Sequence, residues 1–297
     1  MPRTARGAIT LAEEDPTLGG SRLLRRGLAA VMVVAVGTAG WLGWIHLSTL
    51  VSGPTCRATA SGATWEWATD QASNAATITA IGRKRGLPPR AASIALATAM
   101  QESKVRNVRF GDRDSLGLFQ QRPSQGWGTA EQILNPEYST NKFYDALIKV
   151  KGYATMEIAV AAQEVQRSAD GSAYAQHEAQ ARATASTLSG QTAAGFACAL
   201  KEAEQAGDPK ALASVLKDDH GVSGSVDGSV LQVTASSAEQ AWSVAAWAVA
   251  KAEDHGVERV VIGDREWVRS LQESAFTWGD AKTPTSSGTA VRIELAS

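Results

Sequence analysis

The sequence predicts a mainly α-helical protein with an N-terminal transmembrane helix, an all-α domain and a small α+β domain at the C-terminus. Three features predict this class: a long uncharged run near the N-terminus, nearly unbroken helix-forming segments after it, and β-prone runs in the last third. A chain of 297 residues is long enough for one large or two small domains. The predicted parts are a disordered cytoplasmic tail, the transmembrane helix, a linker, the helical domain and the α+β domain, at residues 1–26, 27–51, 52–63, 64–205 and 206–297.

The uncharged run covers residues 27–51 and contains no Asp, Glu, Lys or Arg. As a helix it would be about 37 Å long, and the hydrocarbon core of a bilayer is about 30 Å thick, so the run can cross with some tilt. Arg22, Arg25 and Arg26 precede it and predict a cytoplasmic N-terminus, with both later domains outside the cell membrane. The alternatives are a buried core helix and a cleaved signal peptide, for which residues 58–60 (ATA) offer a cleavage site.

The chain has 2 cysteines, Cys56 and Cys198. Both lie on the predicted outer side, where disulfides persist. We expect them to pair within the chain, joining the start of the extracellular part to the end of its helical domain, with Cα atoms within about 7 Å. Two free thiols, or bridges between chains, are the alternatives.

Six helical segments are predicted in the all-α domain from helix-forming residues and from their start and stop signals. Pro88 and Pro89 suit a helix start, and Gly86 suits the position just after a helix end. The segments are 63–86, 87–103, 129–134, 139–152, 155–169 and 172–190.

The C-terminal part combines helices with strands. Two β-prone runs flank Asp227-Gly228, which is a hairpin signal. The predicted helices are 208–221 and 237–256, the hairpin is 223–235, and three further strands are 258–263, 265–270 and 289–296.

One carboxylate lies at the end of a row of small residues in the segment 87–103. The i, i+4, i+7, i+11 spacing puts four residues on one helix face: Ala91, Ala95, Thr98 and Glu102. An apolar surface and the negative end of a helix dipole both favour the protonated form of a carboxyl. A protonated glutamic acid is what a sugar-cleaving enzyme uses to protonate the leaving oxygen. The alternative is an ordinary surface charge at a helix end.

The loop after Glu102 contains glycines and ends in two glutamines, Gln120 and Gln121. Glycines at 111 and 117 let the backbone approach a bulky ligand, and glutamine amides can donate to and accept from sugar hydroxyls. Trp127 could stack on a pyranose ring. The expected substrate-binding residues are Ser115, Gln120, Gln121, Trp127 and Gln166.

These residues resemble a known family. Glu102-Ser103, followed by Gly-Leu-Phe-Gln at 117–120 and by Pro123, is similar to the signature of lytic transglycosylases and the wider goose-type lysozyme-like superfamily; Asn135-Pro136 and Asn141 match a further family segment. The resemblance covers residues of about 70–190. It implies a lysozyme-like helical domain that cleaves the β-1,4 bond between N-acetylmuramic acid and N-acetylglucosamine in peptidoglycan, with Glu102 as acid and then base.

The chain also departs from the family pattern. An Ala-Tyr-Asn-Ala-Gly segment is expected downstream, and the stretch aligned with it, AAQEVQRSAD (161–170), has no Tyr or Asn; Gln163, Gln166 and Arg167 are possible substitutes. Asp112 and Asp114 are the candidates for a second catalytic carboxylate, or for ordinary turn residues. With a single acid, transglycosylation through the muramic 6-hydroxyl is preferred over hydrolysis.

Composition narrows the partners. The net charge is −1 and no basic stripe with interleaved aromatics occurs, so we expect no nucleic acid. The histidines are scattered, so we expect no metal site and no cofactor. The predicted partners are peptidoglycan glycan strands and the membrane, through residues 27–51, with the partner of the C-terminal domain unknown. Two functions stay open: a membrane-anchored peptidoglycan-cleaving enzyme, or a non-catalytic lysozyme-like domain that binds glycan or envelope proteins.

Overall fold

The structure is a computed structural model that describes residues 53–167 and 171–297. The predicted cytoplasmic tail and transmembrane helix lie outside these residues. In the part of the chain that is described, no helix is long and apolar enough to cross a membrane. The described residues belong to a single compact unit.

A three-stranded antiparallel sheet stands where only helices were expected. Its strands are β1 (Thr55–Ala60), β2 (Ala63–Trp67) and β3 (Phe196–Ala199), in the order β2-β1-β3. Ser61 and Gly62 both have positive φ, 52° and 78°, and form the tight turn between β1 and β2. The all-α prediction for residues 64–205 is therefore wrong, as is the helix predicted to begin at 63.

The helices of this region largely follow the predicted segments. They are α2 (Thr69–Lys84), α3 (Pro89–Ser103), α4 (Ala130–Ile133), α5 (Pro136–Leu147), α6 (Ile158–Gln166) and α7 (Glu178–Leu188), with short 3-10 turns η2 (Pro123–Gln125) and η3 (Gly171–His177). Pro89 begins α3 as predicted, and the Asn135 side chain caps α5. Helix α7 packs against both α3 and β1.

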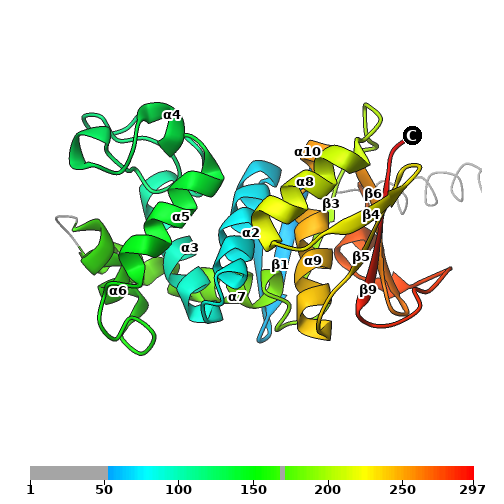
Figure 1. The fold of residues 1–297 in the computed structure, drawn as a ribbon. Coiled ribbons are helices and arrows are strands. Elements are labelled where there is room, and N and C mark those ends of the chain that lie inside the picture. Colours follow the sequence, from blue (N-terminus) through cyan, green and yellow to red (C-terminus); the bar gives the residue numbers. More distant parts are fainter. Residues whose placement is uncertain (1–52, 168–170) are drawn as a thin grey trace, which may run out of the picture. The chain divides into compact units, whose positions relative to one another are not determined.

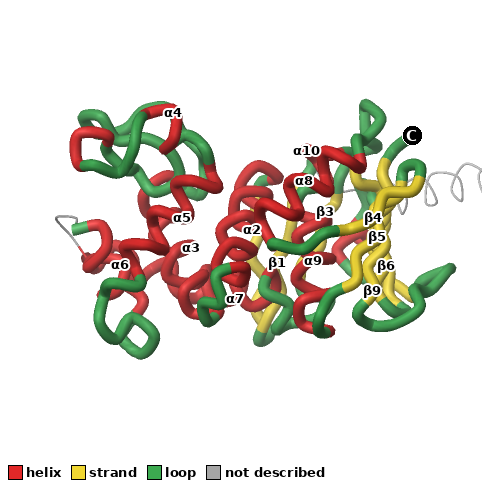
Figure 2. The backbone as a smooth tube through the Cα atoms, viewed as in Figure 1, coloured by secondary structure: helices red, strands yellow, loops and turns green. Residues whose placement is uncertain are grey.

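The C-terminal part is built on a six-stranded antiparallel sheet with the order β4-β5-β9-β6-β7-β8. Its elements are α8 (Pro209–His220), β4 (Gly224–Asp227), β5 (Val230–Thr234), α9 (Ala238–Ala250), α10 (Ala252–His255), β6 (Val257–Ile262), β7 (Arg265–Val268), η4 (Glu273–Phe276), β8 (Gly279–Asp280) and β9 (Ala290–Leu295). Helix α9 packs on β6 and β9 (Figures 1 and 2). With two antiparallel sheets the fold is α+β, so the mainly α class predicted from the sequence is wrong.

Helix α2 joins the helical region to the C-terminal sheet region. It contacts α3 and α5 as well as α8 and α9 (Figure 1). One hydrophobic core cluster runs through both regions, from Ile78 of α2 to Trp247 of α9 and Trp267 of β7. The predicted boundary at residue 205 thus runs through a shared core.

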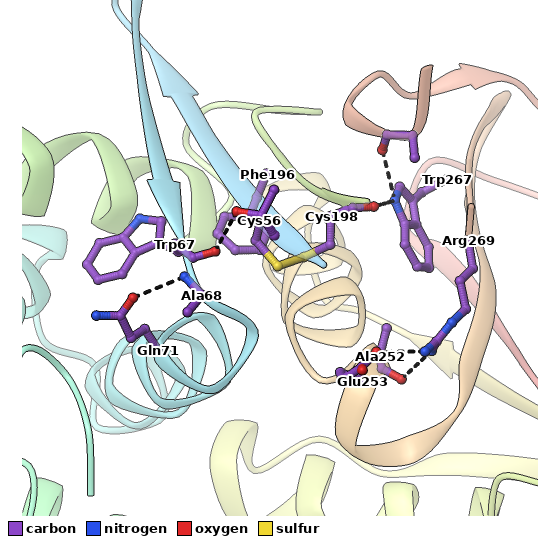
Figure 3. Close-up of a disulfide and its surroundings, with 12 residues drawn as sticks. Cys56, Trp67, Ala68, Gln71, Phe196, Cys198, Ala252, Glu253, Trp267 and Arg269 are labelled. Atoms are coloured by element: carbon purple, nitrogen blue, oxygen red, sulfur yellow. Dashed lines mark hydrogen bonds and ion pairs between the residues drawn. A yellow bond between two sulfur atoms is a disulfide. The ribbon is translucent and has the colours of Figure 1, made fainter. Parts of the chain in front are cut away.

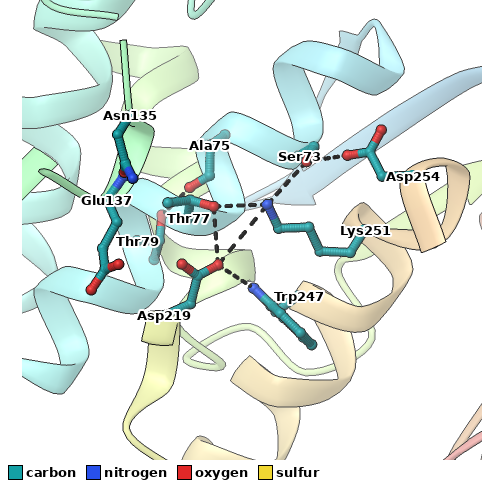
Figure 4. Close-up of polar contacts among 10 residues, drawn as sticks. All are labelled: Ser73, Ala75, Thr77, Thr79, Asn135, Glu137, Asp219, Trp247, Lys251 and Asp254. Carbon is teal, nitrogen blue, oxygen red and sulfur yellow. Dashed lines mark hydrogen bonds and ion pairs between the residues drawn. The ribbon is translucent and has the colours of Figure 1, made fainter. Parts of the chain in front are cut away.

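A buried polar network crosses the same contact (Figure 4). The Lys251 ammonium donates hydrogen bonds to the hydroxyls of Ser73 (3.0 Å) and Thr77 (2.8 Å), and lies 4.0 Å from an Asp219 oxygen. That oxygen also accepts from the Trp247 indole at 2.8 Å. Burial lowers the pKa of Lys251. Because a buried charge is tolerated only where it is paired and hydrogen-bonded, this network requires α2, α8 and α9 to keep one relative position.

The predicted disulfide is confirmed. Cys56 and Cys198 are directly opposite residues of β1 and β3, bonded through their sulfurs, with Cα atoms 3.9 Å apart. The Cys198 carbonyl accepts a hydrogen bond from the Trp267 indole at 3.0 Å (Figure 3). The bridge therefore ties the start of the described chain to the strand that leads into the C-terminal part.

His220 makes the fold sensitive to acid. It is 5% exposed, its Nε2 has no hydrogen-bond partner among the described residues, and its ring meets Trp247 edge-on at 5.7 Å. Burial, reinforced by Arg83 and Lys251, lowers the pKa of His220 to about 3. The unfolded chain has a histidine pKa of about 6.5, so this contribution to stability is complete above about pH 6.5 and falls as the pH drops toward 3.

We expect the free energy of unfolding to fall by about 2 kcal/mol between pH 7 and pH 5 through His220 alone. Urea unfolding of the wild type and of His220→Gln at both pH values measures this. The variant should be less stable at pH 7 but lose less on acidification. Other titrating groups are common to both proteins, so equal pH slopes would contradict the assignment.

Candidate active site

Glu102 lies in the last turn of α3 and is half-buried. The hydroxyl of Tyr174, a buried residue of η3, donates a hydrogen bond to Glu102 Oε1 at 2.6 Å. Tyr174 therefore holds one carboxyl oxygen of Glu102 in place. Among residues 53–167 and 171–297, no lysine or arginine forms an ion pair with this carboxyl.

A strained turn follows Glu102. Lys104 and Val105 both have left-handed φ, 56° and 58°, which is rare for a β-branched residue such as Val105. Helix α2 holds the turn, since the amide of Gln71 donates to the Lys104 carbonyl at 2.7 Å and that of Asn74 to the Val105 carbonyl at 2.9 Å. Strain of this kind persists only where the surroundings over-determine the backbone, and it clusters at functional sites.

The loop at 117–120 is fixed to the end of α3 and to α6. The hydroxyl of Ser103 donates to the Leu118 carbonyl at 2.7 Å. On the other side, the amide of Gln166, the last residue of α6, donates to the Phe119 carbonyl at 2.8 Å. Phe119 is buried and stacks on Phe143 of α5, with ring centroids 4.5 Å apart. Consecutive carbonyls of the loop are thus held from two helices.

Gln120 stands in the loop with a left-handed φ of 49°. Its amide nitrogen lies 3.3 Å from the carbonyls of both Phe110 and Gly117. A Cβ on Gly111 would come within 1.8 Å of Gln120 Oε1, so Gly111 leaves room for the glutamine itself. The glycine that was expected to admit a ligand instead admits Gln120.

Two of the expected substrate contacts face the interior. Gln121 is 1% exposed, forms a β-bridge with Leu116 and donates to the Ser139 carbonyl at 3.0 Å. Ser115 is also buried. Gln121 supports the loop from within, and neither side chain reaches a ligand at the loop surface.

Of the two candidate second carboxylates, Asp114 is hydrogen-bonded within the loop and Asp112 is exposed. Arg122 donates to Asp114 at 2.7 Å, and the backbone and hydroxyl of Ser124 donate to the same side chain. These hydrogen bonds, that of Arg122 above all, hold the pKa of Asp114 far below its ordinary value. Asp112 is exposed and lies 3.9 Å from its neighbour Arg113. Asp114 therefore braces the loop, and Glu102 is the candidate acid.

Trp127 and Gln166 line one cavity of about 950 Å³. The loop between α5 and α6 supplies Lys149, Val150, Lys151 and Met156, and the end of α6 supplies Glu164, Val165 and Arg167; Gln125 and Ala146 complete the lining. Because Gln166 also holds the Phe119 carbonyl, this cavity adjoins the loop that carries Gln120.

Sequence reasoning missed Tyr174. The expected tyrosine was sought in 161–170, whereas the structure brings in a tyrosine from η3, after α6 has ended. The signal was present as Ala173-Tyr174, a few residues further along the chain. Tyr174 orients Glu102, so neither Gln163 nor Arg167 is needed in place of the expected tyrosine.

Comparison of the chain with models of protein families and with curated proteins finds no match. The chemistry must therefore be read from the site. A half-buried carboxyl, oriented by a phenol and joined through the neighbouring Ser103 to a fixed loop, can donate a proton to a ligand oxygen and later accept one. In the described residues no three His, Cys, Asp or Glu side chains gather as metal ligands do.

Proposed function

We propose that the chain cleaves the β-1,4 bond between N-acetylmuramic acid and N-acetylglucosamine in peptidoglycan, with Glu102 as the single acid and base. The observation that supports this most is the hydrogen bond from buried Tyr174 to Glu102 at 2.6 Å. It gives the carboxyl one orientation at the edge of the 117–120 loop, as a proton transfer to a bound ligand requires.

In the proposed reaction, the Glu102 carboxyl first protonates the glycosidic oxygen as the bond to muramic C1 breaks. The resulting carboxylate then removes the proton from the muramic 6-hydroxyl, whose oxygen attacks C1. The product is a 1,6-anhydro end, and Glu102 returns to its protonated form. Tyr174 keeps Oε1 in place through both steps, and Gln120 contacts the sugar from the loop.

We also propose that residues 27–51 anchor the chain in the cell membrane, with the N-terminus in the cytoplasm. The support is the uncharged run with Arg22, Arg25 and Arg26 before it. The Cys56–Cys198 disulfide agrees with an oxidising compartment for the rest of the chain.

The second candidate is a glycan-binding module without catalysis. It is favoured by one observation: Asp114, one of the two candidate second carboxylates, is engaged with Arg122 and Ser124. This module would use the same surface and would bind peptidoglycan without cleaving it.

Product analysis separates the two candidates. The full-length protein, kept in detergent because of residues 27–51, is incubated with purified peptidoglycan, and soluble muropeptides are analysed by mass spectrometry. We expect 1,6-anhydromuramic ends. New reducing ends would mean hydrolysis in place of transglycosylation. Intact peptidoglycan, with the protein bound to it, would refute the enzyme and support the binding module.

A further inference from the structure

We propose that the cavity between Trp127 and the end of α6 is a subsite for the carboxylates of the peptides that substitute the glycan. This inference rests on the proposed function for the identity of the glycan. The cavity volume of about 950 Å³ is at the upper end of ligand sites, which are about 300–1,000 Å³. This volume is much larger than a few water molecules occupy, and it leaves room for a branched ligand.

The charge of the lining carries the inference. Three basic residues, Lys149, Lys151 and Arg167, line the cavity, against one acidic residue, Glu164. All four are exposed. The ion pairs of the described residues do not include any of them. In a chain whose net charge is −1, this cavity therefore concentrates unpaired positive charge on one concave surface.

The neutral part of the lining suits a glycopeptide. Trp127 offers an aromatic face, Val150 and Met156 offer apolar surface, and the amides of Gln125 and Gln166 can donate and accept. A free phosphate or nucleotide would not require this mixture, whereas a sugar that bears a peptide with several carboxylates uses all of it.

Two hydrogen bonds through the 117–120 loop connect the cavity to the residue that follows Glu102. Gln166 lines it, and the same amide donates to the Phe119 carbonyl, next to Gln120. The Ser103 hydroxyl holds the preceding carbonyl, of Leu118, and Ser103 follows Glu102. A glycan with its ring at Glu102 and Gln120 could therefore direct its peptide into the cavity.

The basic residues could instead stabilise the ends of the helices. Lys149 and Lys151 follow the end of α5, and Arg167 caps α6, where positive charges stabilise helix dipoles. That role affects the stability of the protein and does not depend on any ligand. Ligand binding that depends on the ligand's own carboxylates is a readout that a helix-capping role would not change.

The test compares two muramyl glycopeptides of equal sugar length, one with free peptide carboxylates and one with the same groups amidated. Full-length Glu102→Gln protein in detergent is used, so that neither ligand is cleaved. We expect the free-carboxylate form to bind about tenfold more tightly, from three exposed charge contacts. The preference should shrink in 0.5 M salt, at which exposed charges are screened.

Two further variants assign the preference to the cavity. In the same Glu102→Gln background, the triple change Lys149→Ala, Lys151→Ala and Arg167→Ala should bind both ligands equally. The control removes three exposed lysines elsewhere, Lys210, Lys217 and Lys282, and should keep the preference.

Every outcome decides the inference. Equal binding of both ligands by the parent protein, no binding of either, or a preference that survives the triple change overturns it. A carboxylate preference lost in the triple variant supports it, even if product analysis finds no cleavage. In that case the proposed enzyme fails and the cavity remains the anionic subsite of a binding module.

Discussion

Glu102→Gln should abolish bond cleavage and leave the fold intact. Glutamine keeps the size of the side chain and its oxygen can still accept the hydrogen bond from Tyr174, but it can neither give nor take the catalytic proton. General acid–base steps contribute about 10²–10⁴-fold, and here both steps depend on one carboxyl, so a loss of at least about 10³-fold is expected. The rate of release of soluble muropeptides from peptidoglycan measures it.

Two further variants are compared with Glu102→Gln, one with an intermediate expected effect and one as a control. Tyr174→Phe removes one hydrogen bond to the carboxyl and should cost about 10- to 100-fold in rate, since hydrogen bonds to charged groups are worth about 1.5–3 kcal/mol. Glu131→Gln, at an exposed position of α4, is the matched control and should retain the full rate. Cleavage by Glu102→Gln at the wild-type rate would remove Glu102 from the reaction.

Loss of the disulfide should give the largest change in stability. Cys56 and Cys198 are separated by 142 residues in sequence, so the bridge restricts a long loop of the unfolded chain. Replacing both by alanine should lower the free energy of unfolding by about 2–5 kcal/mol. Both side chains are buried, and double replacement avoids leaving one reactive thiol in the core.

Chemical unfolding with and without a reductant measures this effect. Reduced wild type should approach the stability of the double variant, and the double variant should not respond to the reductant. If reduction leaves the unfolding midpoint of the wild type unchanged, the bridge does not stabilise the fold.

Local patterns predicted the part of the site that is continuous in sequence. The small-residue row that ends at Glu102, the proline start of α3 and the 117–120 loop all lie within one helix and the loop that follows it, where spacing carries information. The pairing of Cys56 with Cys198 was also predictable, because two cysteines have one intrachain partner. These features needed no knowledge of distant contacts.

Features made by distant contacts escaped prediction. Strand β3 has four residues and pairs with a strand about 140 residues earlier, so its sequence alone does not distinguish it from a loop. The Ser61-Gly62 turn did indicate the β1–β2 hairpin. The helix-forming residues after it obscured the alternation of polar and apolar residues that is typical of a strand. Gln121 was predicted to contact a ligand, but its side chain is buried against α5 and donates to the Ser139 carbonyl. The sequence around Gln121 does not show that α5 covers it.

The Cys56–Cys198 bridge also defines how the chain would carry a mechanical load. Consider a force applied to the backbone before Cys56 while the six-stranded sheet is held in place. This force passes through the two sulfurs directly to Leu200 and the residues after it. The backbone from 57 to 197, which includes Glu102, Gln120 and Tyr174, forms a covalently closed loop beside this path. Tension applied to the backbone before Cys56 would therefore reach the C-terminal sheet without stretching the segment that contains the candidate site.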